Sequence, residues 1–173
     1  LGSPTYDFYG ADRLGANLFG TSIVALDVRT GKRRWHFQMV HHDLWDMDPN
    51  AAPQLTTIRH EGKRREVVAV AGKTGWLYVF DRDTGAPLWP IEERPVPKSI
   101  MPGDQAWLTQ PFPTSPEPFS RHSFTAADIS PYLSEQEADA IRKRLAAARN
   151  EGIFTPLGLE DTVHIPTNQG GTL

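Results

Sequence analysis

The feature that most constrains the fold of this chain is an internal repeat. Residues 24–35 (VALDVRTGKRRW) return 54 positions later as residues 78–89 (YVFDRDTGAPLW). Each copy predicts a strand, a tight turn built on Asp-x-x-Thr-Gly, and a second strand that opens on a tryptophan. The glycine supplies a backbone position with positive φ, and the aspartate and threonine side chains can hydrogen-bond the turn backbone.

The tryptophans of the two copies, Trp35 and Trp89, stand four residues after the turn glycine. A large flat side chain in this place can lie across the neighbouring repeat. The distance between the copies is near the period of β-propeller blades with loop insertions. We therefore predict a mostly β fold, a partial propeller of about two blades fastened by tryptophan-docking repeats.

The chain around the copies supplies further strands. Residues 65–71 and 76–80 are largely apolar, and the Gly-Lys-Thr-Gly segment at 72–75 joins them as a hairpin. Their continuous apolar runs indicate strands covered on both faces, as inner blade strands are. We also predict a strand at residues 35–40 and another near residues 55–58.

The pattern changes at Pro90, and we treat residues 90–152 as an insertion made of a Pro-rich loop and one helix. The loop carries many prolines but also aromatic residues, which indicates an extended segment laid on a folded surface. Residues 134–137 (SEQE) form a capping box that opens a helix over 134–149. We expect that helix to dock on the body, through Ala138, Ile141, Leu145 and Ala148.

Two short strands, at residues 152–156 and 162–165, are predicted to return the chain to the repeat. The sequence starts at Leu1 without an initiator methionine and stops after Gly170-Gly171-Thr172-Leu173. We therefore expect residues 1–173 to be a fragment of one larger propeller domain, inactive by itself, whose first partner is the rest of that propeller.

Composition excludes several classes of function. The chain has no cysteine, so disulfides, thiol nucleophiles and cysteine-zinc sites are absent. No run of about 18 apolar residues is present to span a membrane. The net charge of -3, with lysines and arginines scattered, argues against a nucleic-acid-binding surface.

One segment is chemically dense, namely residues 41–48 (HHDLWDMD). It can be a solvated polar loop, a metal site made of histidine and aspartate, or the place of a carboxylate that acts as general base. Lys73 lies at the tip of the predicted 72–75 turn, and Asp46 follows the strand that precedes this hairpin. If the strands are adjacent, Asp46 and Lys73 meet at one end of the sheet.

Taken together, these motifs resemble the pyrroloquinoline quinone (PQQ)-dependent dehydrogenases, and within them the glucose and polyol dehydrogenase branch. The resemblance rests on His41-His42-Asp43-Leu44-Trp45-Asp46, on the hairpin with Gly72-Lys73-Thr74-Gly75, on the two repeats, and on the segment 151–156 (EGIFTP). It implies an eight-bladed β-propeller, of which this chain holds about two blades and the Pro-rich insertion.

The resemblance also implies roles for single residues. Asp46 matches the general base that takes the substrate hydroxyl proton while hydride passes to PQQ. Lys73 matches the cation that contacts the quinone oxygens. Asp46 further matches a ligand of the Ca²⁺ (or Mg²⁺) ion that acts as Lewis acid in this family.

Five other residues fall in family-like positions. His42 and Asp43 are expected to position Asp46 without touching substrate. Ser3 stands where the alcohol-oxidising relatives carry an asparagine metal ligand, so the coordination of the ion is open. Arg13 and Asn17 lie in a loop that we expect to contribute to the pocket.

The resemblance implies oxidation of a sugar or another alcohol, electron transfer to ubiquinone or cytochrome c, and a periplasmic location, with any inner-membrane association resting on other segments. A non-catalytic propeller scaffold that binds protein partners is the alternative. A third reading, metal-dependent hydrolysis through His41, His42 and Asp43, needs further ligands. The joint presence of Asp46 and Lys73 favours the enzyme, because a scaffold has no use for the pair.

Overall fold

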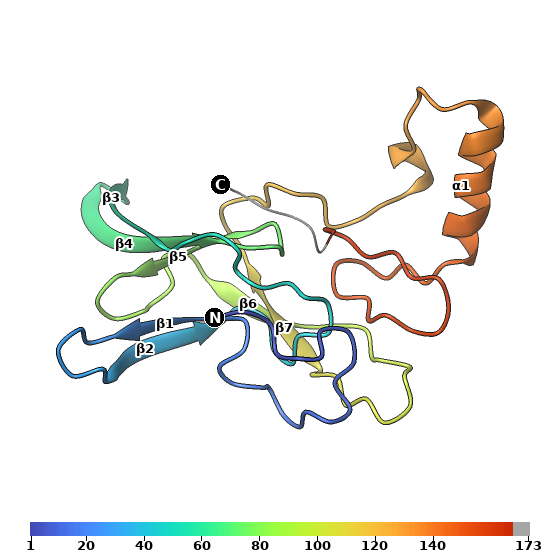
Figure 1. The fold of residues 1–173 in the computed structure, drawn as a ribbon. Coiled ribbons are helices and arrows are strands. Elements are labelled where there is room, and N and C mark those ends of the chain that lie inside the picture. Colours follow the sequence, from blue (N-terminus) through green and yellow to red (C-terminus); the bar gives the residue numbers. More distant parts are fainter. Residues whose placement is uncertain (168–173) are drawn as a thin grey trace.

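The computed structural model describes residues 1–167, which form three antiparallel sheets and one α-helix (Figure 1). The first sheet pairs β1 (Ser22–Leu26) with β2 (Arg33–Gln38). The second holds β3 (Gln54–His60), β4 (Lys63–Ala71) and β5 (Leu77–Asp81) in that order. The third pairs β6 (Ile91–Pro95) with β7 (Thr109–Pro113). The mostly β class, the 72–75 hairpin and the strand near 55–58 are confirmed.

The two repeat turns have the same hydrogen bonds. Asp27 Oδ1 accepts from the backbone N–H of Arg29 and Thr30 and from the Thr30 hydroxyl, at 3.0–3.1 Å. Asp81 makes the equivalent three bonds in the second copy. The glycines that end the turns have φ of 69° and 74°, the left-handed region in which glycine has no Cβ penalty. The repeat is therefore structural as well as sequential.

Trp35 docks on the second copy, as the repeat predicts. Its indole Nε1 donates to the Arg82 carbonyl at 3.0 Å. Its ring lies so close to Gly85 that a Cβ on this glycine would meet ring atoms at 2.5–2.7 Å. Because Gly85 has no side chain, the Trp35 ring of the other repeat can pack directly on its backbone.

The first two sheets pack through aromatic rings. Trp35 and Phe37 point to one face of β2, and Tyr78 and Phe80 to one face of β5, since alternate residues of a strand share a face. The Phe37 ring centroid lies 4.9 Å from that of Phe80 and 6.0 Å from that of Tyr78. Neighbouring Val67, Val68 and Val70 of β4 are buried on both faces, as their continuous apolar run predicts.

At the end of the second copy, the chain leaves the sheet of β3, β4 and β5 and enters the insertion. After the turn of this copy, Pro87 forms an isolated bridge with Phe80, and the Leu88 N–H donates to the Val79 carbonyl beside β5. Beyond Pro90 the chain continues into β6, which pairs with β7 instead. By the repeat, β1 corresponds to β5, and β2 corresponds to the segment that contains this bridge.

The strands β6 and β7 were not predicted, because prolines mark a segment as loop. Pro111 and Pro113 lie within β7 and lack an N–H for the ladder. A two-stranded ribbon tolerates them because each strand has one unpaired edge.

The predicted strands at 152–156 and 162–165 are wrong. Gly152 has φ of 99°, and its carbonyl accepts from both the Thr155 N–H and the Thr155 hydroxyl, so residues 152–155 form a turn. This turn buries Ile153 and Phe154. In the second segment only Thr162 forms a bridge, with Arg149.

The helix α1 (Glu135–Ala147) begins as predicted, with Ser134 as cap and Glu137 completing the capping box. Its predicted docking on the body is wrong, because α1 stands apart from the sheets (Figure 1). Of its apolar positions only Ala138 is buried. Ile141 and Leu145 line a groove with Phe124 and Val163, so the helix packs on loop segments.

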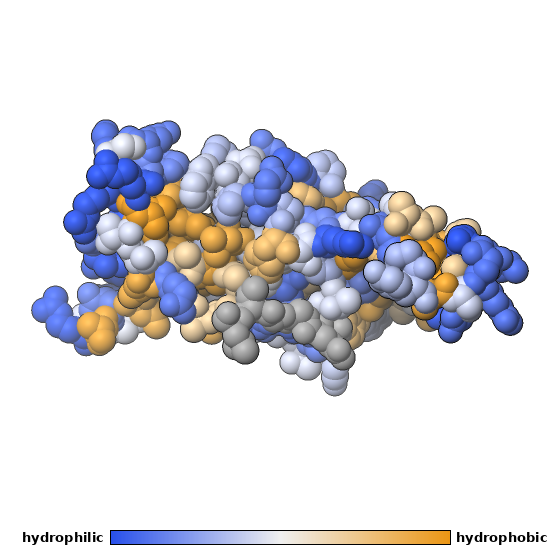
Figure 2. All heavy atoms as spheres, turned by 90° about the horizontal axis from the view of Figure 1, so that it is seen from above, coloured by the Kyte–Doolittle hydropathy of each residue, from blue (hydrophilic) through white to orange (hydrophobic). Residues whose placement is uncertain are grey.

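No helix among residues 1–167 is long and apolar enough to cross a membrane. Hydrophobic side chains gather in a band over the sheet end of the molecule (Figure 2). Part of this surface lines a groove of about 570 Å³ between the first two sheets, where Leu26 and Leu55 are 59% and 67% exposed.

The packing of Trp35 on Gly85 predicts a difference between two turn glycines whose φ values differ by only a few degrees, Gly31 and Gly85. In the protein that contains this chain, Gly31→Ala meets open space and should cost only the left-handed strain, about 1–2 kcal/mol. Gly85→Ala adds a clash with Trp35 and should cost about 1–3 kcal/mol more, as overpacking does. Urea unfolding monitored by tryptophan fluorescence measures both. Equal destabilisation by the two variants would contradict the docking.

Candidate functional site

The loop 41–48 and the tip of the β4–β5 hairpin meet in an ion-pair cluster. Lys73 Nζ lies 2.8 Å from Asp46 Oδ2 and 2.7 Å from Asp48 Oδ1. The three side chains are 15–24% exposed, so they are partly desolvated but reachable from outside. The sequence predicted that Asp46 and Lys73 would meet, and the structure brings them together.

The reason for this meeting differs from the expected one. Asp46 follows β2, which does not pair with β4 or β5. Instead, the Lys73 N–H donates to the Asp48 carbonyl at 3.1 Å, and Gly72 lies flat against Asp48 and Pro49. The hairpin tip is therefore held against the loop by backbone contacts that link two sheets.

Lys73 is a cation that its surroundings stabilise. Burial lowers the pKa of Lys73, but the hydrogen bonds and charges of Asp46 and Asp48 more than offset this, so the pKa lies above its ordinary value. One ammonium between two carboxylates leaves the cluster with one formal negative charge.

Asp43 is fully buried and organises the loop that carries Asp46. Its carboxylate accepts from the hydroxyls of Ser3 and Thr21, at 2.7 and 2.8 Å, and from the N–H groups of Trp45 and Met47, at 2.9 and 3.0 Å. Burial raises the pKa of Asp43, and these four donors oppose the rise. The bonds to the backbone on both sides of Asp46 fix the turn in which Asp46 lies.

His42 is the second buried residue of the loop. Its Nδ1 donates to the Gly15 carbonyl at 2.7 Å, and its backbone N–H donates to the Ala16 carbonyl at 3.0 Å. Its Nε2 lies 3.7 Å from Asp104 Oδ1, which comes from the insertion. His42 therefore connects the loop to Gly15 and Ala16, which precede β1, and to Asp104 of the insertion.

Two residues of the loop have backbone strain. His42 has φ of 45° and Asp46 has φ of 56°, in the left-handed region that costs non-glycine residues energy. Such conformations persist only where surrounding contacts determine them, and they concentrate at functional sites. The contacts of Asp43 and His42 supply that constraint here.

Three other candidates from the sequence have structural contacts. The Ser3 hydroxyl donates to Asp43. Arg13 donates to the Asp43 carbonyl at 2.9 Å and also bonds Asn17, so both residues brace the loop from outside. The pocket role predicted for Arg13 and Asn17 remains a prediction.

His164 is a partly buried histidine that the sequence patterns did not single out. Its ring Nε2 is buried without a hydrogen-bond partner among residues 1–167. Burial lowers the pKa of His164, and the negative charge of Asp46 opposes this shift, which places the imidazole in the field of the Asp46 cluster. The sequence could not relate His164 to Asp46, because His164 lies beyond the helix and far from Asp46 along the chain.

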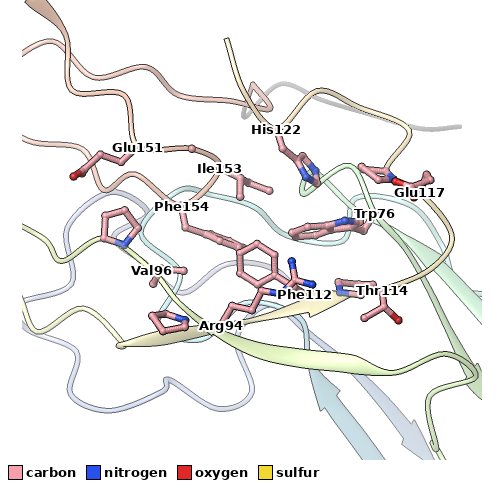
Figure 3. A pocket seen from close by; sticks show the side chains of 15 residues that line it. Trp76, Arg94, Val96, Phe112, Thr114, Glu117, His122, Glu151, Ile153 and Phe154 are labelled. Carbon is pink, nitrogen blue, oxygen red and sulfur yellow. The ribbon is translucent and has the colours of Figure 1, made fainter. Parts of the chain in front are cut away.

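A cavity of about 530 Å³ lies beside the hairpin tip, between β6–β7 and the turn at 152–155 (Figure 3). Trp76, Phe112 and Phe154 line it together, with ring centroids 5.2–6.2 Å apart. His122 closes it toward the tip, because its Nε2 donates to the Thr74 carbonyl at 2.7 Å.

Among residues 1–167, no group of three or more histidine or carboxylate side chains could hold a metal ion. Asp46 and Asp48 supply carboxylate oxygens, whereas Ca²⁺ takes six to eight oxygen ligands. The described residues do not make a metal centre on their own.

Comparison with known proteins finds a family model that matches residues 1–173. It is the PQQ model described as "Glucose/ethanol/alcohol dehydrogenase, beta-propeller domain". The chain is 34% identical over 175 residues to a probable quinate dehydrogenase (quinone) of Xanthomonas campestris pv. juglandis, covering 99% of this chain and 22% of that protein.

Two further relatives differ in named substrate. A quinoprotein glucose dehydrogenase of Escherichia coli (strain K12) is 36% identical over 177 residues, covering 98% of this chain and 21% of that protein. The glycerol dehydrogenase large subunit of Gluconobacter oxydans (strain 621H) is 32% identical over 175 residues, covering 99% and 23%. The chain thus spans about a fifth of the length of each of these relatives.

The hydrogen bonds of Asp43 predict that Asp43→Asn is strongly destabilising. Both carboxylate oxygens face a backbone N–H, so the amide NH₂ of asparagine must oppose one donor in either orientation. We expect a loss of about 2–4 kcal/mol in the free energy of unfolding. Ser3→Ala, which removes only one hydroxyl donor, should cost about 1 kcal/mol. Denaturant melts compare the two, and equal losses would contradict this role of Asp43.

Proposed function

Because the chain belongs to the PQQ-dependent dehydrogenase β-propeller family, we propose that it carries the general base of an enzyme that oxidises a sugar or another alcohol. Membership identifies its sheets as part of a propeller, as the repeat predicted. The observation that supports the activity most is the partly exposed pair of Asp46, on a strained and tightly held loop, and Lys73, at the tip of the β4–β5 hairpin.

Asp46 is proposed to take the hydroxyl proton of the substrate. Its Oδ2 accepts a hydrogen bond from Lys73 Nζ at 2.8 Å, which orients the carboxylate, and an oriented carboxylate within reach of a substrate hydroxyl can act as a general base. PQQ, when bound, supplies the acceptor for the hydride that leaves the carbon bearing this hydroxyl. Loss of the proton to Asp46 and of the hydride to the cofactor leaves a carbonyl product.

Lys73 is proposed to hold the quinone oxygens. The residues fit such a group, because the ammonium is reachable, cationic and carried on a rigid hairpin tip. A fixed positive charge in a partly desolvated place stabilises negative charge that develops nearby. Asp48, the second carboxylate on Lys73, keeps the ammonium oriented.

A metal ion is proposed only with Asp46 as one ligand. Since residues 1–167 hold no group of three suitable side chains, Ca²⁺ or Mg²⁺ would take its other ligands from elsewhere in the protein. The Ser3 hydroxyl donates to Asp43, which leaves the lone pairs of the serine oxygen for another partner. The steps proposed for Asp46 and Lys73 do not depend on the ion.

Ubiquinone or cytochrome c is proposed as the electron acceptor, and the periplasm as the location. The support is similarity alone, since a relative carries the designation "quinone" in its name. The relatives named for quinate, glucose and glycerol differ in substrate, so the proposal stays with the class of alcohols and sugars.

Metal-dependent hydrolysis through His41, His42 and Asp43 has no support in the geometry. The carboxylate oxygens of Asp43 accept hydrogen bonds from four donors within the protein, and His42 is completely buried. His41 bonds Gln38 and Glu93. A protein-binding scaffold remains the alternative, and activity tests separate it from the enzyme.

The role of Asp46 predicts unequal effects of two carboxylates that share Lys73. In the full-length enzyme reconstituted with PQQ and Ca²⁺, Asp46→Asn should lower kcat about 10²- to 10⁴-fold, as loss of a general base does. Asp48→Asn removes the other partner of Lys73 and should cost tenfold at most. Dye reduction with glucose and several alcohols measures both rates. An Asp46→Asn rate within a few-fold of wild type would show that Asp46 is not the base.

Lys73 predicts a defect in cofactor binding. Lys73→Ala should weaken PQQ retention at least tenfold or slow reduction of the cofactor, because the cation near the quinone oxygens is lost. Lys63→Ala, on the exposed start of β4, is the matched control and should behave as wild type. PQQ titration with turnover after dialysis gives the readout, and an unchanged titration and turnover for Lys73→Ala would reject the role.

A further inference from the structure

The insertion holds the first residue of the site loop through one completely buried side chain. Gln110 of β7 is 0% exposed. Its Oε1 accepts from the His41 N–H at 2.8 Å, and its Nε2 donates to the His41 carbonyl at 2.7 Å. Gln110 thus satisfies both backbone groups of His41, across 69 positions of sequence.

This contact replaces a missing strand. The pairing of β1 with β2 ends at Ser22 and Gln38, so His41 lies beyond the ladder. Backbone N–H and C=O groups away from water must be paired, or each costs free energy comparable to a lost hydrogen bond. The carboxamide of Gln110 presents the same donor and acceptor as a neighbouring strand would.

Residues of β6, of β7 and of the connection between them contact His41 and His42. Glu93 of β6 bonds the His41 imidazole, with Oε1 3.0 Å from Nε2. Asp104, in the connection between β6 and β7, lies 3.7 Å from His42 Nε2 with its side chain 2% exposed. Of these contacts only that of Gln110 fixes the backbone itself.

We propose that Gln110 is a positioning residue for Asp46, and this rests on the proposed function. The loop has no regular structure, and Asp46 lies at positive φ within it. Its orientation therefore depends on where the loop is anchored. Gln110 holds the loop at His41, and the contacts of His42, Asp43 and Asp48 described above hold the residues that follow. If the first anchor is lost, the carboxylate shifts relative to Lys73 and to a substrate hydroxyl. Misplacement of about 1 Å can cost about 10²-fold in rate.

The test uses the full-length enzyme loaded with PQQ and Ca²⁺. Gln110→Ala removes both bonds, whereas Gln110→Glu keeps the side-chain volume and loses the donor to the His41 carbonyl. We expect kcat to fall about tenfold to a hundredfold in Gln110→Ala and about tenfold in Gln110→Glu. KM for the alcohol should change less than threefold. Gln54→Ala, which removes an exposed glutamine from β3, is the matched control and should keep the wild-type rate.

A merely structural role is separated by combining these variants with Asp46→Asn. If Gln110 acts through Asp46, the double variant Asp46→Asn/Gln110→Ala is no slower than Asp46→Asn alone, since coupled residues are not additive. Circular dichroism and thermal melts measure how much of each variant is folded at the assay temperature. If Gln110→Ala does not fold, Gln110→Glu is used. Glu93→Ala, at a half-exposed position, removes the other contact between the insertion and His41, the one to its imidazole, with an expected twofold to fivefold loss of kcat.

Three results overturn the proposal: wild-type kcat in folded Gln110→Ala or Gln110→Glu, full multiplication of rate losses in the double variant, or wild-type kcat in Glu93→Ala when neither Gln110 variant folds. These failures are distinguishable from failure of the proposed function. Near-wild-type turnover in Asp46→Asn rejects the base, whereas slow Asp46→Asn with fast Gln110 variants rejects only the anchor.

Discussion

The buried carboxylate of Asp43 is the interaction on which the rest of the site depends. A carboxylate removed from water carries a large desolvation cost unless donors surround it. Here two hydroxyls and two backbone N–H groups do so, and they come from the N-terminal segment, from the residue that precedes β1, and from the turn around Asp46. One charge thereby joins three parts of the chain, and the turn cannot relax without leaving a donor or the charge unpaired.

The two sides of the molecule contribute to this site in different ways. On the repeat side, Trp35 seated on Gly85 and the aromatic rings of β2 and β5 fix the first two sheets against each other. This sets the position of the hairpin tip with Lys73. On the insertion side, Gln110 sets the position of the loop with Asp46. The distance between Asp46 and Lys73 therefore reflects both packings together with the direct bond between the hairpin tip and the loop.

What could be predicted from the sequence was mainly what is local. The Asp-x-x-Thr-Gly turns and the cap at Ser134 are made by residues within a few positions of one another, so their patterns sufficed. The pairing of Asp46 with Lys73 was predicted from adjacent strands, yet it arises between sheets, from the bond of the Lys73 N–H to Asp48. Gln110 and His164 were missed because only the tertiary fold brings them near the loop.

The same distinction explains the errors in the insertion. Prolines argue against a strand inside a sheet but are tolerated in a two-stranded ribbon, so the prolines led to the prediction of a loop where β6 and β7 form. The ribbon also carries Gln110 on β7, whose side chain pairs with the backbone of His41. The insertion thus holds the loop at His41 with a side chain in place of a strand ladder, ahead of His42 and Asp46, whose positive φ values a regular strand could not accommodate.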